Sequence, residues 1–514
     1  MVVAVKSVAL TGLAVHEINI EVDTINSIPQ ITIIGLGDTA ISEAKERLRL
    51  AIKNSGYSFP SGKVVINLAP ADLKKEGTNY DLPIAMGILA QEGYISSSDF
   101  KNYALLGELS LDGELRSITG VLPIVSGLKE LGFSKVIVPY DNKNEAALVD
   151  NIEVYPAKTL KEVINHFSPD SDEKLKRYSI DINKYLENVN FEQYAFDFKD
   201  VKGQKKAKKA LEIAAAGGHN ILMMGTPGSG KTLLSKCFPS ILPPLTLSEA
   251  IELTKIYSVS GLLQKDNPLI NKRPFRTVHH SASAVGIIGG GSNPKPGEIT
   301  LAHRGVLFLD EMVEFPRSVL EVLRQPLEDG EVTISRAQTS VKYPADFILL
   351  GAMNPCPCGY LGDSQKQCVC SDFQITRYRS KLSGPLLDRI DIQIEVPRLS
   401  QEELLKIDDE AETSEQIRER VVKARKIQQE RYKDLPIFSN SELNPKLIKQ
   451  FCQLSSDCEM LLKNAIAKFN LSGRSYDRIL KLSRTIADLE GVENITVSHI
   501  AQALQYRNFV ENKE

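Results

Sequence analysis

The sequence lacks a long apolar run, a strong net charge and a large number of cysteines. No run approaches the roughly 18 apolar residues of a membrane span, so we expect no transmembrane helix. The first residues, from Met1 to Lys6, lack the pattern of a signal peptide, and a cytoplasmic protein is expected. A net charge of −3 gives no overall attraction to nucleic acid, so any such contact must come from local patches. In the cytoplasm, seven cysteines are more often free or metal-bound than paired in disulfides.

What the sequence does contain is the composition of an ordinary soluble protein, 42% hydrophobic and 25% charged. Its 514 residues predict about three domains. Residues 1–167 alternate between β-rich runs and helical patterns, which predicts an α/β domain. Polar residues at 168–190 predict a linker, and 191–398 form the expected nucleotide domain. The helical, charged pattern of residues 399–514 predicts a lid or C-terminal domain, without repeats.

A glycine-rich segment carries the strongest signal. It consists of Gly225, Thr226, Pro227, Gly228, Ser229, Gly230, Lys231 and Thr232. An apolar run at 220–224 precedes it and a helical pattern at 233–238 follows, which is the context in which this motif binds phosphate. The glycines let successive amides wrap an anion, and the helix N-terminus adds free N–H donors. Lys231 is expected to reach the β- and γ-phosphates, and Thr232 to bind Mg²⁺. The alternative is an ordinary glycine turn, but every motif position is filled, so we expect ATP or GTP binding.

A second motif ends an apolar run at 306–309 with Asp310 and Glu311. Such a run predicts a buried parallel strand that delivers two carboxylates at its C-terminal edge. We expect Asp310 to hold Mg²⁺ through water and Glu311 to polarise the attacking water. A strand that ends on a solvated acid pair is the alternative. Downstream of a complete phosphate loop, the functional interpretation is favoured.

A third apolar run, at 347–352, is followed by Asn354 and a proline. Asn354 is then placed to hydrogen-bond the γ-phosphate or the attacking water. A turn-forming asparagine before proline is the better explanation of the residue when it is considered alone.

A lysine-rich segment opens the nucleotide domain at 200–209. Its five lysines are compatible with nucleic-acid binding, but Ala207, Leu211 and neighbouring apolar residues predict a helix with one solvated face. We also expect Val201 and Gln204 to contact the nucleotide.

Two cysteine pairs, Cys356 with Cys358 and Cys368 with Cys370, enclose a nine-residue loop. Four thiolates in two pairs predict a closed, structural Zn²⁺ site. The one-residue spacing is tighter than usual, and four free cysteines are the alternative. The other three cysteines have no such partners and are interpreted as core or surface residues.

Five long motifs together resemble the ComM/YifB family of magnesium-chelatase-like AAA+ ATPases, and the resemblance covers essentially the whole chain. They are APADLKKEG at 69–77, DLPIA at 81–85, PGEITLAHRG at 296–305, NPCPCG at 354–359 and LSGPLLDRID at 382–391. The resemblance implies an α/β fold class: an N-terminal Lon-protease-like (ribosomal S5 domain 2-like) α/β domain, a P-loop AAA+ domain with a parallel sheet, and a C-terminal helical lid.

The same resemblance implies roles for single residues. Asn354 corresponds to the sensor-1 asparagine, Arg389 to an arginine finger, and Arg474 to the sensor-2 arginine. Arg478 lies four residues beyond Arg474 on the same helical face, so the sensor-2 assignment is open between them. An arginine finger acts from a neighbouring subunit, and the family implies a homo-hexameric ring. For all three arginines, a solvated or salt-bridged side chain is the alternative.

Two segments are candidates to line the pore of such a ring. Residues 330–343 alternate like a hairpin and resemble the pre-sensor hairpin of this AAA+ branch, with Arg336 at the tip. Residues 284–292 predict a flexible loop of apolar residues and glycines. Arg336 and Lys342 offer sequence-independent contacts to DNA phosphates. Surface hairpins without a ligand are the alternative.

The N-terminal domain resembles a Lon-type protease but lacks its catalytic pair. A Lon-type protease needs a serine nucleophile and an activating lysine, and the matching stretches at 79–83 and 120–123 supply neither. We therefore expect a scaffold or DNA-binding platform rather than a peptidase.

The resemblance implies an ATP- and Mg²⁺-dependent hexameric motor on single-stranded or branched DNA. It would promote branch migration and strand integration, together with recombination machinery and without a membrane partner. The alternatives are the motor subunit of a metal-insertion complex, or a machine that remodels or degrades proteins.

Overall fold

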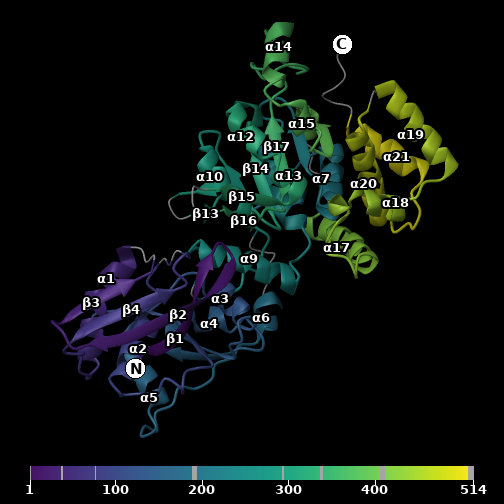
Figure 1. The fold of residues 1–514 in the computed structure, drawn as a ribbon. Coiled ribbons are helices and arrows are strands. Elements are labelled where there is room, and N and C mark those ends of the chain that lie inside the picture. The colour runs from purple at the N-terminus through teal and green to yellow at the C-terminus, as the bar shows by residue number, and fades with distance from the viewer. Residues whose placement is uncertain are drawn as a thin grey trace. The chain divides into compact units, whose positions relative to one another are not determined.

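The structure is a computed structural model that describes residues 2–35, 39–73, 75, 77–187, 194–264, 266–291, 294–335, 340–405, 411–469 and 471–507. The chain folds into two compact units (Figure 1). The first unit consists of residues 1–188 together with 246–271, and the second of 189–245 together with 272–514. None of the described helices is long and apolar enough to cross a membrane.

The first unit contains two sheets of three or more strands, a separate two-stranded ribbon and a buried helix. Its strands are β1 (Val3–Thr11), β2 (Ala14–Ile25), β3 (Gln30–Ile34), β4 (Lys63–Ala69), β5 (Tyr103–Leu105), β6 (Glu108–Leu109), β7 (Leu115–Arg116), β8 (Lys135–Pro139) and β9 (Glu153–Ala157). Its helices are α1 (Thr39–Asn54), α2 (Asp81–Gln91), α3 (Val121–Leu128), α4 (Lys143–Ala146), α5 (Leu160–Phe167), α6 (Ile182–Glu187) and α9 (Leu247–Val259). One sheet has the order β1-β2-β4-β3, and the other is parallel with the order β5-β8-β9. Helix α2 packs on β1 and β2, and its nearly continuous apolar sequence explains why Asp81 through Leu89 are all buried.

Helix α9 corrects the domain boundaries expected from the sequence, which placed residues 246–271 inside the nucleotide domain. In the structure α9 packs on α3 and belongs to the first unit. Thr246 and Glu249 form a capping box that starts the helix. Near its end, the buried Ser258 hydroxyl donates to Glu145 at 2.5 Å, and the Leu122 N–H donates to the same carboxylate at 2.8 Å. Tertiary contacts far from the nucleotide motif therefore decide where this segment belongs.

The second unit is built on a parallel sheet with the order β11-β14-β17-β10-β18. These strands are β11 (Phe275–Val278), β14 (Val306–Leu309), β17 (Ile348–Met353), β10 (Ile221–Met224) and β18 (Ile392–Glu395). Strands β10, β14 and β17 are buried along their whole length, as their apolar runs predict. Because the strands are parallel, the phosphate loop, the acid pair and Asn354 all follow the same edge of the sheet. That edge is where an open α/β sheet binds its ligand.

The structure describes fourteen α-helices in the second unit. They are α7 (Lys205–Gly217), α8 (Lys231–Cys237), α10 (Ala284–Ile288), α11 (Glu298–Leu301), α12 (Arg317–Val322), α13 (Pro326–Asp329), α14 (Asp372–Arg379), α15 (Gly384–Leu387), α16 (Gln401–Leu405), α17 (Ser414–Arg431), α18 (Pro445–Phe451), α19 (Ser456–Phe469), α20 (Gly473–Glu490) and α21 (Val497–Gln505). Helix α7 packs against α17 and α20, and all three contribute to the same hydrophobic cluster (Figure 1). On α7 the alanines and Leu211 are buried while Lys205 and Lys206 are exposed, so the predicted solvated lysine face is confirmed.

Two short β-ribbons complete this unit. Strands β15 (Glu331–Ser335) and β16 (Ser340–Pro344) pair in antiparallel register, which confirms the predicted hairpin. The expectation of a flexible glycine loop at 284–292 is wrong for its described part. Residues 284–288 form α10. Ser283 caps the N-terminus of this helix, because its hydroxyl accepts from the Gly286 N–H. Gly289 and Gly290 then form β12, paired with β13 (Lys295–Pro296).

Candidate active site

The phosphate loop joins β10 to α8. Gly228 and Gly230 have φ values of 78° and 92°, a left-handed conformation that glycine adopts without strain. Gly225 is needed for a different reason, because a Cβ there would lie 2.2 Å from the carbonyl oxygen of Val396. The loop therefore lies directly against the chain that follows β18.

Lys231 points into this loop. Its Nζ donates to the carbonyl oxygens of Gly225 at 2.7 Å and Thr226 at 3.0 Å, and to Asn354 Oδ1 at 3.4 Å. Burial lowers the pKa of Lys231, while the nearby Asp310 and Glu311 act in the opposite direction. A buried ammonium held by neutral oxygens is ready to exchange them for phosphate oxygens.

The acid pair follows β14, as predicted. The Thr232 hydroxyl donates to Asp310 Oδ2 at 3.1 Å, so the two expected Mg²⁺ ligands are adjacent. Glu311 has a φ of 50°, and 57% of its side chain is exposed. Its Oε2 lies 3.8 Å from Nδ1 of His280, which our sequence interpretation did not single out. His280 lies two residues after β11, whose C-terminal end lies beside that of β14.

Asn354 follows β17 and is fixed from helix α14. Its backbone N–H bonds to Tyr378, whose pKa is raised, chiefly by burial. Arg379 Nε donates to the Pro355 carbonyl oxygen at 3.2 Å. The amide oxygen of Asn354 contacts Lys231, so this side chain reaches the lysine of the phosphate loop.

The residues present fit a nucleotide and its magnesium ion. The Ser229 hydroxyl is buried in the loop without a hydrogen-bond partner among the described residues, as expected for a group that awaits an anion. The Gln204 side chain contacts the phosphate loop, because Nε2 donates to the carbonyl oxygens of Ser229 at 3.3 Å and Pro397 at 2.6 Å. These two hydrogen bonds connect Gln204 to the phosphate loop and to the chain after β18. Val201 is buried in the core of the second unit.

The three candidate arginines form two groups of ion pairs. Arg389 is buried and forms an ion pair with Glu328, and Arg474 Nη2 lies 3.3 Å from the same carboxylate. Arg478 instead pairs with the buried Asp391 at 2.6 Å. Burial acts to raise the pKa of Asp391, but Arg478 and His219 outweigh it and hold that pKa well below its usual range. The partner of Arg478 is therefore buried, whereas the Glu328 carboxylate beside Arg474 is exposed.

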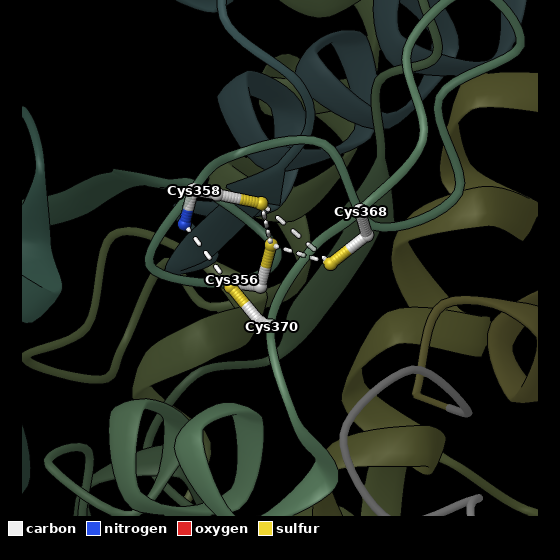
Figure 2. A group of neighbouring side chains, drawn as sticks. All are labelled: Cys356, Cys358, Cys368 and Cys370. Atoms are coloured by element: carbon white, nitrogen blue, oxygen red, sulfur yellow. Dashed lines mark hydrogen bonds between the residues drawn. The ribbon is translucent and has the colours of Figure 1, made fainter.

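The four cysteines of the two predicted pairs converge. Their side chains point toward one another (Figure 2), and all four sulfurs lie within 4.8 Å of one another. Sγ–Sγ distances are 3.4 Å between Cys356 and Cys358, and 3.6 Å from each of these to Cys368. Four thiolates about 2.3 Å from one zinc ion would lie about 3.8 Å apart, so the cluster fits a tetrahedral site. Backbone N–H groups of Tyr360 and Val369 lower the pKa of Cys358 to about 6, whereas the pKa values of Cys368 and Cys370 are raised. The other three cysteines of the chain are buried.

The candidate DNA contacts are only partly described. Arg336, which the sequence predicts at the tip of the hairpin, lies outside the described residues. Lys342 is exposed on β16, and its Nζ lies 2.6 Å from Glu331 Oε1 on the facing strand. The two ribbons touch, because the Tyr343 hydroxyl donates to the Pro294 carbonyl oxygen at 2.9 Å.

Comparison with known proteins identifies related sequences along most of the chain. Models described as subunit ChlI of Mg-chelatase, magnesium chelatase subunit ChlI, and its C-terminal part match residues 20–142, 197–404 and 411–507. Competence protein ComM of Haemophilus influenzae is 44% identical over 509 residues, which cover 98% of this chain and 97% of the relative. Uncharacterized protein YifB of Escherichia coli is 39% identical over 501 residues, which cover 97% and 96%.

A third relative matches only in part. Lon protease 2 of Bacillus subtilis is 32% identical over 141 residues, which cover 27% of this chain and 25% of the relative. This match, the parallel sheet and the helical C-terminal region confirm the predicted fold class.

Proposed function

Because this chain belongs to the ComM/YifB family of magnesium-chelatase-like AAA+ ATPases, we propose that it works as a hexameric motor on DNA. Family membership supports ATPase activity, and the geometry of the phosphate loop agrees with it. The observation that carries the proposal is the convergence of Lys231, Asp310 and Asn354 at one edge of the sheet. The DNA substrate is supported by the relative named as a competence protein.

One chain supplies the first half of the proposed catalytic site. The loop amides and Lys231 bind the phosphates, and Thr232 and Asp310 hold Mg²⁺, which neutralises phosphate charge when it is bound. Glu311 is exposed at the edge of the site, where its carboxylate orients and deprotonates the attacking water. Asn354 fixes the position of Lys231 and of the γ-phosphate.

A neighbouring chain supplies the second half. Arg389 and Arg474 share Glu328, so the two guanidinium groups move to a neighbour's nucleotide together. Phosphate oxygens then replace Glu328 as their partner. Arg478 remains with Asp391, and we therefore assign sensor 2 to Arg474.

The DNA grip is assigned to the two touching ribbons. Arg336 and Lys342 provide phosphate contacts on the β15–β16 hairpin, and DNA binding requires Lys342 to leave Glu331. The first unit serves as a scaffold, without the serine and lysine of a peptidase. The motor of a metal-insertion complex and a protein-remodelling machine are the competing functions.

The cysteine cluster is assigned to one structural zinc ion, held by Cys356, Cys358, Cys368 and Cys370. The sulfur spacing supports this assignment. The expected content of the purified protein is one zinc ion per chain.

The decisive experiment measures ATPase rates of the wild type and Glu311→Gln with and without branched DNA, alongside a branch-migration assay. We expect branched DNA to stimulate the wild type, and Glu311→Gln to bind ATP but hydrolyse it at least about 100-fold more slowly. Glu314→Gln is the matched control, because this nearby glutamate pairs with Lys381 at the surface and keeps the wild-type rate.

Other outcomes would identify a different substrate. An ATP-competent ring that neither binds nor remodels DNA would contradict the DNA proposal. Loss of pigment synthesis on deletion, with DNA handling intact, would favour the metal-insertion motor. ATP-dependent cleavage of casein that depends on residues 1–167 would favour the proteolytic machine.

A further inference from the structure

The segment that contains both cysteine pairs and the residues between them, 356–370, lies against the phosphate loop. We call it the cysteine loop. A Cβ on Gly359 would lie 2.8 Å from Cγ of Pro227, so glycine is what allows the two loops to approach this closely. The φ of Gly359 is 85°, which also favours glycine. The proposed metal site and the proposed nucleotide site therefore share a boundary within the second unit.

Arg398 bridges the two loops with all three groups of its guanidinium. Its Nη2 donates to the Pro227 carbonyl oxygen at 3.2 Å, on the phosphate loop. Its Nε lies 3.2 Å from Asp363 Oδ2, and Nη1 donates to Gln365 Oε1 at 2.9 Å, both on the cysteine loop. A planar fork of donors fixes distance and angle together, which a lysine in the same place cannot do.

Asp363 is well placed to hold this arginine. Its side chain is inaccessible to solvent, and Oδ1 accepts the backbone N–H groups of Gln365 at 2.7 Å and Lys366 at 3.0 Å. The Gln365 N–H is the largest influence that lowers the pKa of Asp363, and Arg398 and the Thr226 hydroxyl add to it. The carboxylate is thus ionised at neutral pH and its position is set by the cysteine loop.

The bond to Pro227 has a direct consequence for phosphate binding. In a trans peptide the carbonyl oxygen and the next N–H point in opposite directions. When Arg398 holds the Pro227 oxygen, the N–H of Gly228 faces away from Arg398. The orientation of one phosphate-binding amide is thereby set before the nucleotide arrives, which lowers the entropy cost of binding.

We propose that Asp363 and Arg398 are positioning residues of the nucleotide site, and that metal bound by the four cysteines holds them in place. This inference rests on the ATP and zinc sites of the proposed function. Closing four thiolates on one ion fixes both ends of the segment that carries Asp363. Metal binding and nucleotide affinity are then coupled, although Asp363 and Arg398 are not expected to touch the reacting atoms.

The test compares full-length wild type, Arg398→Gln, Arg398→Lys and Asp363→Asn. Nucleotide Kd is measured with fluorescent ADP in excess Mg²⁺, together with kcat, KM for ATP and zinc content. We expect Arg398→Gln and Asp363→Asn to raise Kd and KM about tenfold, while kcat stays within about twofold and zinc is retained. Arg398→Lys is expected to recover only part of the affinity, because the fork is lost. Lys381→Gln, which removes a surface ion pair, is the matched control with unchanged Kd.

Metal removal provides the second arm of the test. Wild type stripped of zinc and returned to Mg²⁺ buffer is expected to lose the same tenfold or so in affinity, and stripping Arg398→Gln is expected to add little. Unchanged Kd in zinc-loaded Arg398→Gln overturns the inference, and so does full additivity of the two losses. A wild type that contains no metal overturns its metal part. Kd is read without DNA, so a failure of the DNA proposal is distinguishable.

Discussion

Asp81 shows how one buried carboxylate makes stability depend on pH. Burial raises its pKa from 3.8 to about 6, although Arg47 lies 3.0 Å away. The folded chain therefore holds this proton up to about pH 6, whereas the unfolded chain releases it near pH 4, so this site costs stability as the pH rises between them. Asp81→Asn mimics the protonated form. We predict that, between pH 4 and pH 7, its free energy of unfolding rises relative to that of the wild type by up to about 3 kcal/mol. Urea unfolding followed by circular dichroism measures this difference, with the exposed Asp99→Asn as control; a constant difference across this range would contradict the prediction.

Helix α9 shows how an element can belong to a different unit from the residues that flank it in the sequence. The Ser258 hydroxyl, the Leu122 N–H and Nδ2 of Asn142 all donate to the buried carboxylate of Glu145, whose pKa is raised by burial. Ser258→Ala removes that donor, and we predict a loss of about 1–3 kcal/mol in the local stability of α9. Hydrogen exchange of residues 247–259 should then be faster. Ser260→Ala is the matched control, because its hydroxyl donates to the Ile256 carbonyl oxygen of its own helix at 2.7 Å. Equal exchange in both variants would mean that the Glu145 contact does not anchor the helix.

The whole assembly is where the arginines acquire a role. Lys231→Ala is predicted to lose nucleotide binding, and Arg389→Ala to bind ATP without turnover. If Arg389 acts on a neighbour's nucleotide, a ring that mixes Lys231→Ala and Arg389→Ala chains contains some complete interfaces. In these, one chain supplies an intact phosphate loop and the other supplies an intact Arg389. Equal mixing makes about one interface in four complete, so we predict recovery of up to about a quarter of the wild-type ATPase rate. Mixing Lys231→Ala with Glu311→Gln is the control. Both changes lie in the half-site that one chain supplies, so no interface in this mixture is complete even though every chain carries Arg389. No recovery in the first mixture would place Arg389 in its own chain's site.

Much of the candidate site was predictable because its signals are local. The phosphate loop, the acid pair and Asn354 each follow an apolar run, and a run of that kind predicts a buried strand from its own residues. Parallel pairing then requires the three strand ends to meet, so the contacts of Lys231 with Asn354 and of Thr232 with Asp310 follow from pattern and topology together. The cysteine cluster was predictable for the same reason, since the close spacing of the cysteines within each of its two pairs is a local feature of the sequence.

The remainder depended on contacts between residues far apart in the sequence. Nothing near Arg398 indicates that it joins Asp363 to the carbonyl oxygen of Pro227, 171 residues away. Likewise, only the structure separates Arg474, which shares Glu328 with Arg389, from Arg478, which pairs with Asp391. The sequence by itself determined the chemistry of the site, because residue type and strand pattern are local properties. The tertiary structure decided which side chains support that chemistry and to which unit α9 belongs, because packing and ion pairing are set by non-local neighbours.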